Sequence, residues 1–152
     1  MFYVINEIVL LVSDECLRDQ RLTNFSSATT MEKNGWVFSN CIRHKPTESN
    51  EMCGNSTTLH GSGLDCITSL TTNFTGSGTA VFSFGNCNDS GMVVFKKFDL
   101  SGKGFVDAAE GNNMSREIKF DYLPNQFIEL ITFDNAVIKL NFLQINCKTY
   151  NF

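Results

Sequence analysis

The sequence has little of several features on which common functions depend. It contains two histidines, and its 12 lysines and arginines form no basic tract and are outnumbered by 16 acidic residues. A sequence pI near 5.1 is not compatible with the positive surface that non-specific nucleic-acid binding requires. The longest uninterrupted apolar run near the N-terminus, Ile8 to Val12, is far shorter than the ~20 residues of a membrane span. We therefore expect no nucleic-acid partner and no membrane span.

The pattern of a catalytic centre is also missing. Ser62 stands near His60, but no GxSxG turn surrounds a serine, and a serine nucleophile needs a base that a third group orients. The Gly102-Lys103-Gly104 stretch lacks the full phosphate-binding loop. The chain of 152 residues, 42% of them hydrophobic and 18% charged, suits a single globular domain. The sequence predicts a protein that is not an enzyme.

The cysteines are even in number, and none belongs to a CxxC pair. The absence of tight Cys pairs disfavours a structural zinc site. Disulfides are therefore expected, although the sequence does not fix how the six cysteines pair. Cys41 with Cys53 is the favoured pair, because a short polar segment separates them. The expected disulfide residues are Cys16, Cys41, Cys53, Cys66, Cys87 and Cys147.

Asn-x-Ser/Thr acceptor sequences for N-glycosylation are modestly more frequent than chance placement predicts. They occur at Asn24, Asn55, Asn73, Asn88 and Asn113. Disulfides and N-linked glycans both form in an oxidising secretory pathway. Together with the even number of cysteines, these acceptors predict a glycoprotein that is secreted or held at the cell surface.

Residues 1–15 form an apolar N-terminal segment, and residues 16–152 are expected to form one β-sandwich domain. Asn6 and Glu7 interrupt the apolar run and no basic residue precedes it, unlike a signal peptide. The segment is a poor leader, or the leader lies upstream of Met1, or residues 2–12 form a strand that is apolar on both faces. Burial of that strand in the same copy predicts a monomer, and burial in a neighbouring copy predicts a filament.

Short β-type segments separated by turn residues dominate from about residue 34 onward. Residues 116–122 alternate strictly, and the segment 136–147 is expected to place Ile138, Leu140 and Phe142 on one face. The expected strands are 35–41, 64–70, 79–85, 92–98, 104–109, 116–122, 126–133 and 136–147. About eight strands at this spacing are typical of an antiparallel sandwich or barrel. The predicted fold is an all-β, antiparallel β-sandwich of jelly-roll type, cross-linked by disulfides.

The segment NFSSATTMEKNGWVFSN (24–40) resembles the first strands of secreted jelly-roll and lectin-like modules. Sugars are commonly held by an aromatic ring with polar groups beside it, because one side of a pyranose is apolar. Trp36 and Tyr122 are the candidate sugar-binding residues on this basis. The alternative is that Trp36, the only tryptophan, belongs to the core.

The segment FKKFDLSGKGFVDAAE (95–110) resembles an EF-hand calcium loop. Its candidate metal ligands are Asp99, Ser101, Asp107 and Glu110. However, Lys103 occupies a position where that family supplies an oxygen ligand, and the flanking residues are not helix formers. The preferred interpretation is a hairpin of strands 92–98 and 104–109. No cofactor is then expected, and calcium remains the alternative.

These observations predict a non-catalytic extracellular module for recognition or adhesion, with a glycan or glycoprotein as its partner. An alternative is a structural subunit of an extracellular matrix or filament, which self-associates through the N-terminal strand. A calcium-binding protein is the third interpretation.

Overall fold

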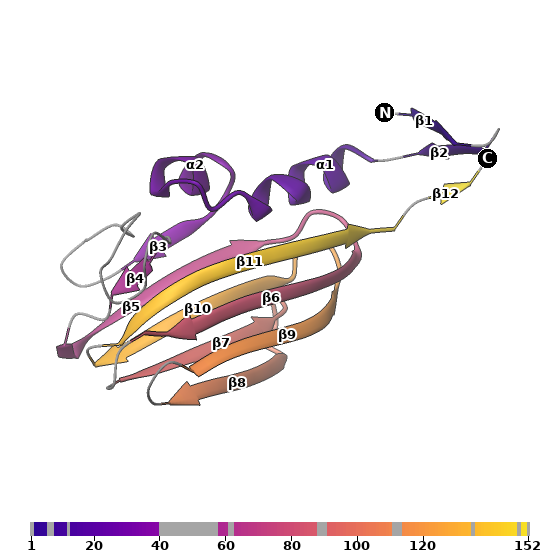
Figure 1. Ribbon diagram of the computed structural model, residues 1–152. Helices are drawn as coiled ribbons and strands as arrows, with labels where there is room; N and C mark the ends of the chain where they lie inside the picture. The colour runs from indigo at the N-terminus through magenta and orange to yellow at the C-terminus, as the bar shows by residue number, and fades with distance from the viewer. Residues whose placement is uncertain are drawn as a thin grey trace.

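The computed structural model describes residues 2–5, 8–11, 13–39, 58–60, 63–87, 91–110, 114–134, 136–148 and 150–151. Two stacked antiparallel sheets account for most of this chain (Figure 1). Their strands are β3 (Val37–Ser39), β4 (Thr58–His60), β5 (Gly63–Asn73), β6 (Gly78–Asn86), β7 (Met92–Phe98), β8 (Gly104–Glu110), β9 (Met114–Tyr122), β10 (Phe127–Asp134) and β11 (Val137–Cys147).

The strand order is that of a jelly roll. The five-stranded sheet has the order β3-β5-β10-β7-β8 and the four-stranded sheet the order β4-β11-β6-β9. Strands β4 to β11 supply the eight strands of the two interlocked Greek keys, and β3 extends the first sheet at its edge. The predicted fold class is confirmed, and β7 coincides with the expected strand 92–98.

The core lies between the two sheets and is rich in phenylalanine. The ring of Phe82 lies 5.5 Å from that of Phe84 and 5.9 Å from that of Phe95 on the facing sheet. Aromatic side chains alternate inward along β6 and β9, as strands with one buried face require. The polar residues between them must therefore point to the outside of the sandwich.

Three short helical segments that the sequence analysis did not predict precede the sandwich. They are α1 (Asp14–Gln20), the 3-10 helix η1 (Arg21–Thr23) and α2 (Ala28–Lys33). Ser13 and Ser27 cap the two α-helices, because each hydroxyl accepts a backbone N–H of the first turn. These segments run along one edge of the sandwich (Figure 1). Leu22 and Met31 enter the core from there.

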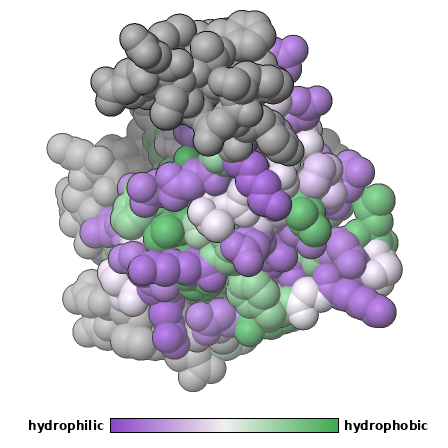
Figure 2. Space-filling model, turned by 90° about the vertical axis from the view of Figure 1, so that its right-hand side faces the viewer, coloured by the Kyte–Doolittle hydropathy of each residue, from purple (hydrophilic) through white to green (hydrophobic). Residues whose placement is uncertain are grey.

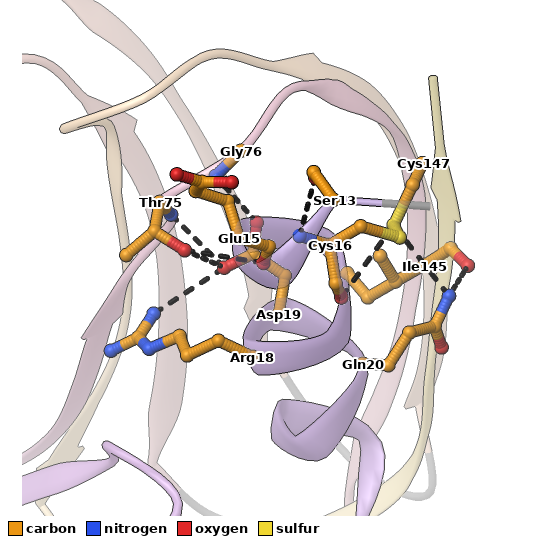
Figure 3. Close-up of a disulfide and its surroundings, with 10 residues drawn as sticks. All are labelled: Ser13, Glu15, Cys16, Arg18, Asp19, Gln20, Thr75, Gly76, Ile145 and Cys147. Carbon is orange, nitrogen blue, oxygen red and sulfur yellow. Dashed lines mark hydrogen bonds and ion pairs between the residues drawn. A yellow bond between two sulfur atoms is a disulfide. The ribbon is translucent and has the colours of Figure 1, made fainter. Parts of the chain in front are cut away.

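A disulfide joins α1 to the end of β11. Cys16 bonds to Cys147, with 5.7 Å between the two Cα atoms (Figure 3). Beside this bond, the Gln20 side-chain amide donates to the carbonyl of Ile145 at 2.8 Å. The last residues of β11 are therefore held in place from the helix side.

A buried carboxylate fixes the other side of α1. Asp19 is fully buried and accepts hydrogen bonds from the backbone amides of Thr75 and Gly76, at 3.0 and 2.8 Å. The Thr75 hydroxyl donates to the same carboxylate (Figure 3). Arg18 lies 3.4 Å from Asp19 and donates to the carbonyl of Asn73 at 2.6 Å. These hydrogen bonds satisfy the buried carboxylate of Asp19, and they hold α1 against the turn between β5 and β6.

The two chain ends form a small separate sheet. Strand β1 (Phe2–Ile5) pairs with β2 (Ile8–Leu11), which also pairs with β12 (Tyr150–Asn151). A strand over 2–12 was one of three alternatives in the sequence analysis, and the structure has two shorter strands, 2–5 and 8–11, within that range. Figure 1 shows this sheet beyond the end of β11. Within the described part of the chain, no helix has the length and hydrophobicity needed to cross a membrane.

Candidate functional site

A bulge in β11 turns an aromatic ring outward. Ile138 and Leu140 lie opposite Asn86 and Phe84, but the register shifts between Leu140 and Phe142. Phe142 is consequently 40% exposed, whereas the next residue, Leu143, is buried in the core. The prediction that Phe142 shares a face with Ile138 and Leu140 is wrong, because one extra residue inverts the side-chain alternation.

The outward positions around Phe142 are mainly polar. Three rows of facing residues cross β11, β6 and β9, and they are Phe142-Ser83-Glu117, Gln144-Val81-Lys119 and Asn146-Thr79-Asp121. The Asn141 side-chain amide donates to the Ser83 hydroxyl at 3.0 Å, which fixes the polar groups next to the ring. Amide and hydroxyl side chains can both donate and accept hydrogen bonds, so this face suits a ligand rich in hydroxyl groups.

Two hollows lie on the described part of this face. One has a volume of about 350 Å³ between β6 and β9, and the other, of about 400 Å³, lies where β11 ends. Both are lined by Thr79 and Asp121, so the two hollows adjoin. Asn146, Cys147 and Lys148 line the second hollow, at the strand end that the disulfide holds. Figure 2 looks onto this end of the molecule, where hydrophilic residues are mixed with smaller hydrophobic groups.

The charges on this face are of mixed sign. Glu117, Lys119 and Asp121 are all exposed and alternate in charge along β9. A site for a polyanion would gather positive charge instead. The arrangement therefore suits a neutral ligand that is held by hydrogen bonds and by contact with a ring.

Another hollow, of about 290 Å³, lies on the five-stranded sheet near the β7–β8 hairpin. Its lining includes Lys96, Phe98 and Phe105. Phe105 is 39% exposed, almost the same as Phe142. This hollow is smaller than either hollow on the four-stranded sheet, but it is a second surface on which aromatic and polar groups meet.

The structure places both sugar-binding candidates of the sequence analysis in the core. Trp36 is 1% exposed, and its indole N–H donates to the carbonyl of Leu22 at 3.0 Å. Tyr122 is also 1% exposed, and its ring stacks on Phe74 at 4.3 Å. Neither ring is exposed enough to present a face to a ligand, although Tyr122 also lines the hollow of about 400 Å³. The aromatic contact is therefore assigned to another residue, Phe142.

The hydroxyl group of Tyr122 is buried together with its ring. Its oxygen has no hydrogen-bond partner among the described residues. Burial, and secondarily the charge of Asp19, raises the pKa of Tyr122 to about 12. The hydroxyl lies over Gly78, where an added Cβ would come within 2.8 Å of it, so the glycine leaves the space that the ring needs.

The segment that resembles an EF-hand loop is a β-hairpin, as the sequence analysis preferred. Asp99 accepts hydrogen bonds from the backbone N–H groups of Ser101 and Lys103, at 2.9 and 3.0 Å, and so closes the turn. The hydrogen bond from the Ser101 hydroxyl is the main reason why the pKa of Asp99 is lowered. Asp107 and Glu110 lie along β8, where they pair with Phe95 and Met92 of β7. Among the described residues, no group of acidic, histidine or cysteine side chains could hold a metal ion.

The structure locates two of the five glycosylation acceptors. Asn24 is exposed and follows η1, and Asn73 is the last residue of β5. Asn55, Asn88 and Asn113 lie outside the described residues. Nothing in the structure tests whether any of them carries a glycan, so glycosylation stays a prediction.

The cysteine positions are described in part. Cys16 pairs with Cys147, and Cys87 is also disulfide-bonded. The favoured pair of Cys41 with Cys53 lies outside the described residues, and Cys66 belongs to β5. The prediction that the fold is cross-linked by disulfides is confirmed at Cys16 and Cys147.

Solved structures of similar fold include TmCBM61, determined in complex with β-1,4-galactotriose. Its sequence is 10% identical, its TM-score is 0.51, and the match covers 74% of this chain and 88% of that one. The K1 cleaved adhesin domain of Lys-gingipain from Porphyromonas gingivalis W83 is 13% identical, with a TM-score of 0.52, and the match covers 74% and 90% of the two chains. No protein-family model and no curated protein matches the sequence. At these identities the likeness shows the fold alone.

Proposed function

We propose that this protein is a non-catalytic, extracellular carbohydrate-binding module that holds a neutral glycan on the outer face of its four-stranded sheet. The observation that carries the proposal is Phe142, which the β11 bulge turns out of the core and into a row of polar side chains. Phe142 is not part of the core cluster between the sheets, and the positions around it are mainly polar. It provides the apolar surface on which one side of a pyranose can lie.

The polar groups around Phe142 supply the specificity in this proposal. Gln144 and Asn146 present amides along β11, and Thr79 adds a hydroxyl from β6. Residues 79 to 85 of β6 span roughly 20 Å at the usual rise of a strand. This length accommodates a short oligosaccharide that runs along the strands, with one sugar on the ring and the others hydrogen-bonded in the two hollows.

Two further observations support the proposal. The fold is shared with TmCBM61, a protein whose structure was determined with β-1,4-galactotriose bound, and with an adhesin domain. The Cys16–Cys147 disulfide and the five acceptor sequences suit a protein that passes through a secretory pathway. An extracellular module of this kind would recognise or adhere to a glycan or a glycoprotein.

The proposal is tested by a glycan array probed with the purified protein. We expect retention on one family of neutral oligosaccharides, with little change between 50 mM and 500 mM salt, because hydrogen bonds and ring contact carry the binding. Retention on sulfated or uronic-acid glycans alone, with loss at high salt, would contradict a neutral ligand. If the protein at millimolar concentration binds no glycan, the proposed carbohydrate-binding function is contradicted.

The small terminal sheet favours a second candidate function, that of a structural subunit. Strand β1 pairs with β2 alone among the described strands, so one edge of this sheet is open to another chain. The mass of the intact protein in solution tests this alternative. A monomer before and after deletion of residues 1–12 contradicts it, whereas large assemblies that the deletion converts to folded monomers support it.

A further inference from the structure

A stacked pair of phenylalanines lies on the outer face of the five-stranded sheet. Phe127 on β10 is opposite Phe98 on β7, and the two rings lie 5.3 Å apart at an angle of 9°. The next residue on β10, Ile128, is part of the core, so Phe127 points to the other side of the sheet. Both rings are partly exposed. This aromatic pair is therefore a surface feature that the core does not use.

Asn73 stands at one end of this pair. It is opposite Phe127 on the neighbouring strand β5, and it is partly exposed between two buried residues, Thr72 and Phe74. Side chains that face each other across antiparallel strands have Cβ atoms about 4.5–5.5 Å apart. Asn73 is also the acceptor of the sequence Asn73-Phe74-Thr75. The first sugar on its amide would therefore begin beside the Phe127 ring.

Space for further sugars lies at the other end of the pair. Phe98 is opposite Gly104, which has no side chain, and both residues line the hollow of about 290 Å³. Lys96 and Glu129 line the same hollow and offer a donor and an acceptor. Asn73, Phe127, Phe98 and the hollow thus follow one another across β5, β10, β7 and β8.

We propose that Asn73 carries an N-linked glycan whose first sugars lie over Phe127 and Phe98 and reach the hollow above Gly104. In the attachment step, the Asn73 amide nitrogen loses one proton and bonds to the anomeric carbon of the first sugar. The bond between that carbon and the diphosphate of a lipid-linked sugar donor breaks, the diphosphate leaves with the electron pair, and the proton passes to solvent. The glycan then covers the aromatic pair and stabilises the five-stranded sheet.

The residues next to Asn73 indicate whether the glycan is attached before or after the chain folds. The Thr75 hydroxyl donates to Asp19 at 3.0 Å, and Phe74 is fully buried. The acceptor sequence is thus built into the junction with α1 once the chain has folded. Attachment at Asn73 must precede folding, and the folded, unmodified protein is expected to be a poor substrate for glycosylation.

Asn24 is a second N-glycosylation acceptor that serves as the control for Asn73. It is an exposed acceptor, but the adjacent Phe25 packs against the core, where its ring lies 6.0 Å from that of Trp36. The Asn24 side chain accepts the backbone amide of Ser26 at 3.0 Å. The substitution Ser26→Ala removes this acceptor sequence and keeps Asn24 in place. A glycan at Asn24 would project into solvent and should contribute little to stability.

The test uses protein secreted from eukaryotic cells, with glycopeptide mass spectrometry to establish occupancy of Asn73. Melting temperatures are then compared for Asn73→Gln, Phe127→Ala and the double variant. We expect Asn73→Gln to lower the melting temperature by roughly 2–4 °C when Phe127 is present and by much less in the Phe127→Ala background. Ser26→Ala should have the same small effect in both backgrounds.

Two results would overturn the proposal. One is an unoccupied Asn73 in the secreted protein, and the other is an equal effect of Asn73→Gln with and without Phe127. If Phe127→Ala does not fold, Phe127→Leu removes the ring while it keeps an apolar side chain, and the same comparison applies. Glycan binding at Phe142 is measured separately on the opposite sheet, so the outcome does not depend on the proposed function.

Discussion

The Asp19 carboxylate accepts the backbone amide of Gly76 at 2.8 Å and thereby joins α1 to the turn between β5 and β6. This contact links residues 57 positions apart in the sequence. A carboxylate this deeply buried is tolerated only because several donors surround it. The same junction holds the disulfide and the end of β11, which lines the larger hollow of the candidate site.

Replacement of Asp19 should therefore be costly. We expect Asp19→Ala to lower the free energy of unfolding by about 3 kcal/mol, because it leaves the part-buried amides of Thr75 and Gly76 without their acceptor. Asp14→Ala, on the exposed first turn of the same helix, is the control and should cost less than about 1 kcal/mol. Urea unfolding followed by circular dichroism measures both values. Similar losses for the two variants would show that Asp19 does not lock the helix.

Removal of the Cys16–Cys147 disulfide should also destabilise the domain. The bond closes a loop between residues 131 positions apart. We expect the double substitution Cys16→Ser and Cys147→Ser to reduce stability by about 2–5 kcal/mol. Thermal unfolding measures the loss, and a peptide map without reductant checks the pairing. Recovery of a Cys16 peptide attached to a different cysteine would contradict the structure.

Tyr122 predicts a specific dependence of stability on alkaline pH. Its pKa is about 12 in the folded protein and near 10 in the unfolded chain. The unfolded chain releases this proton first as the pH rises, so this ionisation leaves the free energy of unfolding unchanged below pH 10 and lowers it between about pH 10 and 12. The Tyr122→Phe variant should not show this fall in stability. Urea unfolding midpoints of the two proteins between pH 8 and 11.5 measure the difference.

At neutral pH the same substitution tests the hydroxyl itself. Because the oxygen has no partner among the described residues, we expect Tyr122→Phe to raise stability by about 1 kcal/mol. A loss of stability at pH 7 would indicate that the hydroxyl is hydrogen-bonded after all.

The β7–β8 hairpin should not respond to calcium. Because Asp99 already accepts hydrogen bonds from Ser101 and Lys103, its carboxylate is committed to the turn. Far-UV circular dichroism is expected to show β structure with or without 1 mM calcium. Calorimetry should detect no binding tighter than ~10⁻⁵ M, the weak end of the sensor range. Tight binding that disappears in Glu110→Gln would restore the EF-hand interpretation.

Much of the sandwich could be predicted from local patterns. The sequence identified β9 by the strict alternation of residues 116–122, because a strand with one buried face alternates in hydrophobicity. It identified β7 by the turn residues on either side of 92–98. The helices were missed because each is six or seven residues long and shows no clear stripe. Their signals were the caps Ser13 and Ser27, and acidic Asp14 and Glu15 in the first turn of α1.

The candidate site was missed for a related reason. Apolar residues on β11 occupy the even positions Ile138 and Leu140 and then the odd positions Leu143 and Ile145. This change of parity is the sequence signal of a bulge, and it indicates that Phe142 faces outward. The pairing of Cys16 with Cys147 had no such signal, because it depends on the position of α1 on the finished sandwich.

The most direct test of the account compares two phenylalanines of equal exposure on opposite sheets. Phe142 is 40% exposed and Phe105 is 39% exposed. With an oligosaccharide identified on the array, isothermal titration calorimetry is performed on Phe142→Ala and Phe105→Ala, each checked for folding by circular dichroism. We expect Phe142→Ala to weaken binding by roughly 10- to 30-fold, as the loss of a central aromatic contact does, and Phe105→Ala to leave it unchanged. Unchanged binding in Phe142→Ala, or a loss confined to Phe105→Ala, would contradict a glycan site on the four-stranded sheet.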